Sequence, residues 1–193
     1  MITFKSNTEV KTPEEIFNQI SSRFIAATMM HVQFANYFDF LGMKGYKRLH
    51  EYQYFAESAE HREVSKYFIN HHGKLLSDTF SGEVRIIPDS WYGANRLGVG
   101  KSTKQKAVED SFLEYQTWEK ETKSVYEKYA YILRESGHIS DAIFVEKLIS
   151  AVSDEVENID RMMADLISTG YDMTYIMEIQ KEIHDKYKKM VKG

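Results

Sequence analysis

The sequence predicts an all-α protein, a bundle of four long helices with one long connection between the second and third helices and a short fifth helix. Over long segments, apolar residues recur three and four positions apart, which is the spacing that covers one face of an α-helix. Only two prolines occur in 193 residues, so few positions forbid a helix. The breaks between the periodic segments are short, with a single long exception.

The helices are expected to begin and end at turn residues. Thr12, followed by Pro13 and two acids, is typical of a helix N-terminus, and Gly42 follows the first apolar segment. Later breaks fall at "SGH" (136–138) and "STG" (168–170). The five predicted helices cover residues of about 13–41, 45–76, 105–136, 140–168 and 173–190.

The long connection, residues 77–103, is rich in glycine and turn residues. It contains Pro88 and the short apolar run "EVRII", which cannot form a sheet as a single extended stretch. The short links make the first and second pairs of helices antiparallel hairpins. A helix of about 28 residues is about 40 Å long, and the long connection can travel that distance. In this single-crossover topology, inward-facing carboxylates commonly build metal sites.

The composition limits the classes of protein to consider. A chain of 193 residues has the size of one domain, and we expect a single domain over 1–193. Cysteine is absent, which excludes disulfides and thiolate metal sites. The net charge is −4, with acids and bases mixed along the chain, unlike a nucleic-acid binder. The first residues lack the apolar core of a signal peptide, and no apolar run reaches transmembrane length. We expect a soluble, cytoplasmic protein that binds neither nucleic acid nor membranes.

Acidic and histidine side chains interrupt the apolar faces of three predicted helices. In "YFAESAEHREVSKYF", Glu57, Glu60 and His61 are spaced i, i+3 and i+4 and share one helix face. Glu119 and Glu155 each occupy a core position near the middle of a later helix. A buried, unpaired carboxylate costs several kcal/mol, so it is paired, protonated or bound to a metal. Carboxylates with imidazole favour iron, manganese or zinc. These residues together predict a metal site inside the bundle.

Each of these residues also has a structural alternative. The three side chains of the second helix could belong to a solvated helix face. A small rotation of the third helix would turn Trp118 and Thr122 inward and leave Glu119 at the rim, and the fourth helix allows the same for Glu155. His31, on the apolar face of the first helix, is expected to be a core histidine hydrogen-bonded to a neighbour.

Several motifs resemble the ferritin family, and the resemblance covers nearly the whole chain. "ANYFDFLGMKGYKRL" (35–49) resembles the turn between the first two ferritin helices, and "GEVRIIPDSW" (82–91) resembles the ferritin crossover. "SVYEKYA" (124–130) and the segment after Gly170 also fit the family. The order and spacing of these motifs carry the resemblance together.

Ferritins oxidise ferrous iron with dioxygen at a dinuclear centre inside each bundle and store the ferric mineral in a hollow shell. The resemblance therefore implies iron as the bound metal, dioxygen as the oxidant and a homo-oligomeric shell. It places the ligands of the second, third and fourth helices at Glu57, Glu119 and Glu155.

The chain departs from the ferritin pattern at two ligand positions. The glutamate of the first helix falls on Phe24. The histidine of the second helix falls on Glu60, with His61 one residue later, and the sequence leaves open which of the two turns inward. Loss of a carboxylate removes charge and a ligand, so we expect one iron position to be weakened and oxidation to be slower or absent.

The sequence leaves two other interpretations of the function open. The chain could be a ferritin-fold shell or interaction protein whose carboxylates pair with Lys or Arg and bind no catalytic metal. It could also resemble the mini-ferritins that protect DNA, using His31 with Glu57 or His61. The lack of a basic tail and the presence of a helix after the fourth count against the latter.

Overall fold

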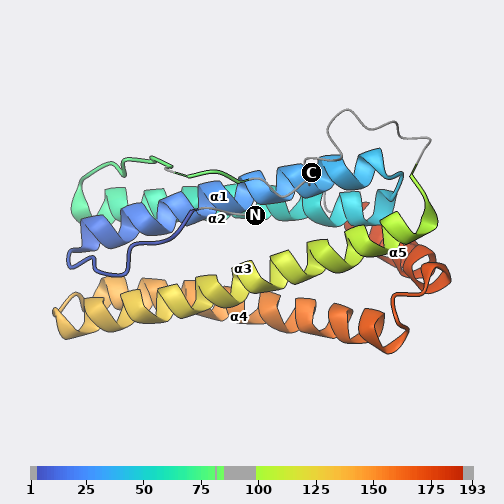
Figure 1. Cartoon of the computed structure of the whole chain (residues 1–193). Coiled ribbons are helices and arrows are strands. Elements are labelled where there is room, and N and C mark those ends of the chain that lie inside the picture. Colours follow the sequence, from blue (N-terminus) through green and yellow to red (C-terminus); the bar gives the residue numbers. More distant parts are fainter. Residues whose placement is uncertain (1–3, 81, 85–98, 189–193) are drawn as a thin grey trace.

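The computed structural model describes residues 4–80, 82–84 and 99–188. This part of the chain consists of five α-helices and their connections (Figure 1), as the sequence predicts. They are α1 (Pro13–Phe40), α2 (Lys44–His72), α3 (Lys101–Glu135), α4 (Ile139–Ser168) and α5 (Met173–Lys188). Within these described ranges, no helix is long and apolar enough to cross a bilayer.

The beginning of α1 and the ends of three helices follow local sequence signals. The Thr12 side chain accepts a hydrogen bond from the Glu15 backbone N–H, and the Glu15 carboxylate accepts one from the Thr12 backbone N–H, which forms a capping box. Gly42, Gly137 and Gly170 have φ values of 73°, 81° and 59°. After each of them the next N–H bonds to a carbonyl five residues earlier, and this motif stops the helix.

Two helix boundaries differ from the sequence prediction. The second helix was expected to reach residue 76, but α2 ends at His72 because Gly73 adopts a left-handed conformation with a φ of 64°. The third helix begins at Lys101, four residues earlier than expected. The predicted end of the last helix, residues 189–190, lies outside the described residues.

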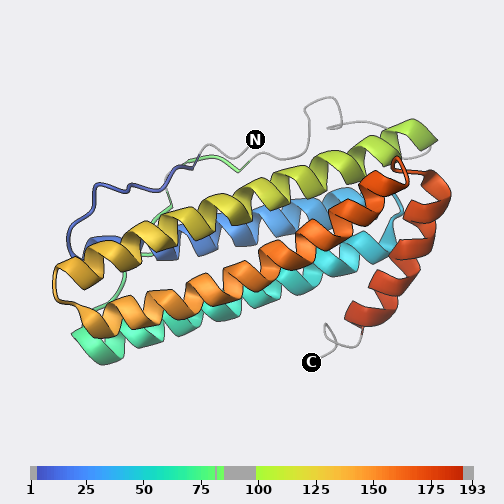
Figure 2. The same cartoon turned by 90° about the horizontal axis from the view of Figure 1, so that it is seen from below.

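The four long helices form two antiparallel hairpins, α1 with α2 and α3 with α4 (Figures 1 and 2). After α2 the chain turns back along α1, where Ser77 bonds to Asn18 at 2.7 and 2.9 Å and Ser22 donates to the Thr79 carbonyl at 2.6 Å. Most of "EVRII", Pro88 and the rest of the ferritin-like crossover motif lie outside the described residues. The described part therefore shows an all-α bundle and the start of its crossover.

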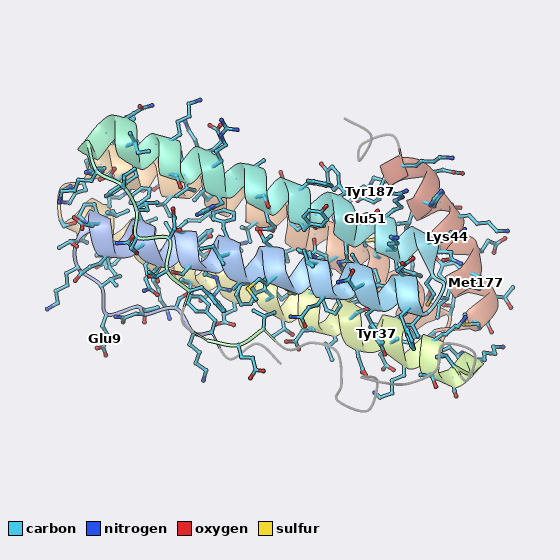
Figure 3. The ribbon with its side chains drawn as sticks, turned by 90° about the horizontal axis from the view of Figure 1, so that it is seen from above. Glu9, Tyr37, Lys44, Glu51, Met177 and Tyr187 are labelled. Atoms are coloured by element: carbon cyan, nitrogen blue, oxygen red, sulfur yellow. The ribbon has the colours of Figure 1, made fainter. Side chains whose placement is uncertain are left out.

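Helix α5 packs against the beginning of α2 at one end of the bundle, where Figure 3 shows Lys44 and Met177. The two backbones meet at Gly45, since a β-carbon there would lie 1.9 Å from the Gln180 carbonyl oxygen. Ile176 is fully buried in the same contact. A glycine is required at this position for α5 to dock.

The apolar core is divided into two clusters along the bundle. The cluster at the α5 end includes Phe34, Leu49, Phe112, Ile159 and Ile176. The cluster at the opposite end includes Phe17, Phe68, Tyr129, Ala142 and Val145. Between the two clusters lies a polar layer, which we define by Arg23, Glu57, Glu119 and Glu155, one residue from each long helix.

Candidate metal site

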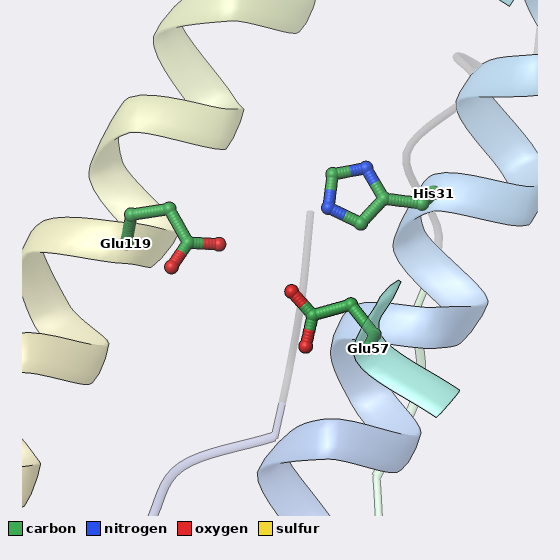
Figure 4. A group of neighbouring side chains, drawn as sticks. All are labelled: His31, Glu57 and Glu119. Carbon is green, nitrogen blue, oxygen red and sulfur yellow. The ribbon is translucent and has the colours of Figure 1, made fainter. Parts of the chain in front are cut away.

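The polar layer brings Glu57 of α2 and Glu119 of α3 together, and His31 of α1 lies beside them. One nitrogen or oxygen atom of each residue lies within 4.8 Å of the others. Figure 4 shows the two carboxylates directed toward one another, with the His31 ring beside them. The helical spacing explains the convergence, because all three residues lie on the apolar stripes that face the interior.

Two atoms of this cluster have no hydrogen-bond partner among the described residues. Glu119 is 3% exposed and its Oε1 is unpaired, and His31 is 0% exposed with an unpaired Nε2. A buried polar atom without a partner costs about 1–3 kcal/mol. Both atoms are good ligands for a divalent cation, so a single bound ion would give each of them a partner.

The carboxylates of the cluster resist ionisation in the metal-free protein. Burial, and then the charge of Glu155, raise the pKa of Glu119 to about 8. The pKa of Glu57 is also raised well above its ordinary value, first by burial and then by Glu119. Arg23 opposes the rise at both carboxylates. A divalent cation between them would favour their charged forms and so oppose the effects of both burial and repulsion.

Glu155 and Glu60 lie next to this cluster. Glu155 accepts hydrogen bonds from the Tyr115 hydroxyl and the Gln53 amide, and Gln53 also donates to the Tyr115 oxygen at 2.6 Å. Burial raises the pKa of Glu155 despite these bonds, and burial and the charge of Glu155 raise that of Glu60. Four carboxylates thus share one electrostatic environment in the middle of the bundle.

His61 faces away from the carboxylates. Its Nε2 lies 2.9 Å from Ser21 Oγ and 3.0 Å from Asp78 Oδ1, so it joins α2 to α1 and to the start of the crossover. The sequence left open whether Glu60 or His61 turns inward. Of the two, Glu60 interacts with the acids, because burial and the charge of Glu155 raise its pKa. A ligand role for Glu60 or His61 stays a prediction.

The first helix contributes Arg23 to the polar layer and places Phe24 next to it. Arg23 is 1% exposed, and its guanidinium donates to Thr122 Oγ1 at 2.6 and 3.1 Å and stacks 4.1 Å from the centre of the Trp118 ring. Phe24 packs against Tyr126, with ring centres 6.4 Å apart. Trp118 and Glu119 are both buried. The inward position of Trp118 therefore does not leave Glu119 at the rim of the bundle. Sequence reasoning missed the buried cation at Arg23.

His31 has a second histidine as its neighbour. Its Nδ1 lies 2.9 Å from the Nδ1 of His50, and the two rings are stacked. Burial lowers the pKa of His31 to about 3 and that of His50 well below its ordinary value, so both are neutral near pH 7. The sequence correctly predicts that His31 is a buried histidine bonded to a neighbour. It missed His50, and it placed His31 beside Glu57 only in the mini-ferritin alternative.

The donor set of the cluster fits a divalent transition ion. One imidazole nitrogen and two carboxylates suit iron, manganese or zinc, whereas calcium and magnesium take oxygen ligands alone. Three protein ligands from three helices leave further coordination positions for water or a substrate. The structure therefore defines an all-helical bundle with a possible His/carboxylate metal site in its centre.

No protein-family model matches the chain, and no curated protein has a similar sequence.

Proposed function

We propose that this protein is a ferritin-like bundle that binds ferrous iron at His31, Glu57 and Glu119. The observation that carries the proposal is the set of unfilled donors, because buried Glu119 Oε1 and His31 Nε2 face a common centre without a hydrogen-bond partner among the described residues. The paired hairpins, the fifth helix and the motifs described above support the ferritin-like assignment. Oxidation by dioxygen and storage of ferric iron in a homo-oligomeric shell are part of the same proposal.

The residues of the site have distinct roles in this proposal. Glu57 and Glu119 bind iron as carboxylates and must release their protons when the ion arrives, because both are held protonated in the metal-free state. His31 contributes a neutral nitrogen. Iron supplies the redox chemistry, giving one electron to dioxygen for each ferrous ion oxidised. Phe24 provides no ligand, so we expect one well-held ion per chain and slow oxidation.

Anaerobic titration with ferrous iron tests the binding step. We expect the wild-type protein to bind iron and the Glu57→Gln, Glu119→Gln double variant to lose most of this binding. Glu63→Gln with Glu127→Gln is the matched control, because it removes two exposed acids from the same two helices. Equal iron binding by the wild type and the first double variant would overturn the proposal.

A second candidate function is a bundle that serves assembly or interaction without catalysis. The packing of Phe24 in the core favours it, as does Arg23, a buried cation that already compensates part of the acidic charge. The rate at which ferric absorbance appears in air, measured together with the native mass, separates the two. Iron binding without oxidation above the buffer rate would favour this second function, and a large closed assembly that accumulates ferric iron would favour storage.

A further inference from the structure

His31 and His50 share one hydrogen bond in the interior. Their Nδ1 atoms are 2.9 Å apart, and the residues are 0% and 1% exposed. Two ring nitrogens this close form a hydrogen bond only when one carries a proton and the other offers a lone pair. Only one proton can lie between the two Nδ1 atoms, which means that one histidine donates and the other accepts.

Binding of a metal ion to His31 determines whether the His31 ring or the His50 ring donates the hydrogen bond. The ligating nitrogen of an imidazole must offer a lone pair, so it carries no proton. His31 Nδ1 faces His50, which leaves Nε2 as the nitrogen available to the carboxylate cluster. When Nε2 binds the metal, the His31 proton is on Nδ1 and His50 Nδ1 is its acceptor.

The environment of His50 holds its ring in place for this role. The centre of the His50 ring lies 4.8 Å from that of Phe34, 5.6 Å from that of Phe38 and 5.7 Å from that of Tyr115. Its Nε2 has no hydrogen-bond partner among the described residues. An apolar side chain would fill this site and avoid the unpaired Nε2, but it would leave His31 Nδ1 without a partner. The hydrogen bond to His31, rather than packing, therefore accounts for a histidine at this position.

We propose that His50 is a positioning residue of the metal site, which accepts the hydrogen bond from His31 Nδ1–H and so aims His31 Nε2 at the ion. The inference rests on the proposed metal binding and adds a residue that does not touch the metal. Hydrogen-bond partners of histidine ligands typically change metal affinity by about 10–100-fold.

Three variants separate this role from simple packing. His50→Leu keeps an apolar filler but removes the acceptor, and we expect Zn²⁺ and anaerobic Fe²⁺ to bind about 10–100-fold more weakly. His50→Asn retains an oxygen that can accept from His31, and we expect it to recover most of the affinity. Phe34→Leu changes the same aromatic surroundings without removing the acceptor, so its affinity should stay close to that of the wild type. Circular dichroism confirms that each variant is folded.

The tautomers themselves give a readout that packing would not change. In the Zn²⁺-loaded wild type with ¹⁵N-labelled histidine, long-range proton–nitrogen correlations should show the His31 proton on Nδ1 and the His50 proton on Nε2. This measurement needs no variant, so it remains decisive even where His50→Leu does not fold. A different tautomer at His31, or full affinity in folded His50→Leu, would overturn the role of His50 and leave the metal site standing. A wild type that binds no metal would overturn both proposals.

Discussion

Replacing Glu119 by glutamine measures how much unfolding free energy the metal-free protein loses by burying this acid in the polar layer. Burial and the charge of Glu155 raise the pKa of Glu119 from 4.5 to about 8. The folded protein therefore keeps a proton that the unfolded chain has released, and its stability falls as the pH rises between these two values. The loss is about 1.4 kcal/mol per pH unit, or roughly 3 kcal/mol by pH 7.

Glutamine resembles the protonated acid in shape and carries no charge. We therefore expect metal-free Glu119→Gln to match the wild type near pH 4.5 and to exceed its unfolding free energy by roughly 3 kcal/mol at pH 7. For a chain of this size, that difference corresponds to about 6–12 °C in Tm. The substitution also removes a proposed ligand, so added Zn²⁺ should stabilise the wild type but not the variant.

Thermal and urea unfolding, followed by circular dichroism between pH 4.5 and 8, would measure the first effect with a chelator present and the second with Zn²⁺ in place of the chelator. Glu127→Gln on the same helix is the control, because Glu127 is exposed and its replacement should leave the pH dependence unchanged. The reasoning is refuted if the wild type and Glu119→Gln lose stability with pH at the same slope, or if the variant is the less stable protein at every pH.

Three further outcomes follow from other parts of the structure. At pH 8, Zn²⁺ at a hundred times its dissociation constant should raise the unfolding free energy of the wild type by about 2.7 kcal/mol, and no rise would speak against a folded-state site. Gly45→Ala forces a β-carbon against the Gln180 carbonyl, so limited proteolysis should cut α5 faster than in the wild type; unchanged protection would contradict the close contact. His61→Ala removes bonds to Ser21 and Asp78 and should cost about 1 kcal/mol of stability, while Fe²⁺ affinity, measured by titration, stays within about twofold. A tenfold loss of affinity would instead place His61 among the ligands.

The helices were largely predictable because their signals are local. Thr12, Gly42, Gly137 and Gly170 act on backbone groups a few residues away, and the structure has boundaries at or next to each of them. Gly73 carries the same kind of signal, but the predicted helix continued past it to residue 76. Its left-handed conformation decides the end of α2, and a single sequence does not show which glycine will adopt it.

The interior site was predictable only in part because it depends on how the helices are aligned. Helical spacing left a solvated face open for Glu57 and a rim position open for Glu119. The coincidence of acids on three helices, together with the ferritin resemblance, pointed both residues inward, and the structure brings them together. Adjacent residues point about 100° apart on a helix, so Glu60 and His61 could not be separated until their neighbours were known. The proximity of His31 to His50 depends on the register between α1 and α2, for which no local sequence motif exists.

The division of the core by the polar layer has a mechanical consequence. The polar layer separates the two apolar clusters, so in the metal-free protein we expect one half to open while the other stays folded. An ion held by α1, α2 and α3 would link the two halves, which would then unfold as one cooperative unit. Native-state hydrogen exchange should then show partial openings confined to one half without metal, and their merging into global unfolding once the ion is bound.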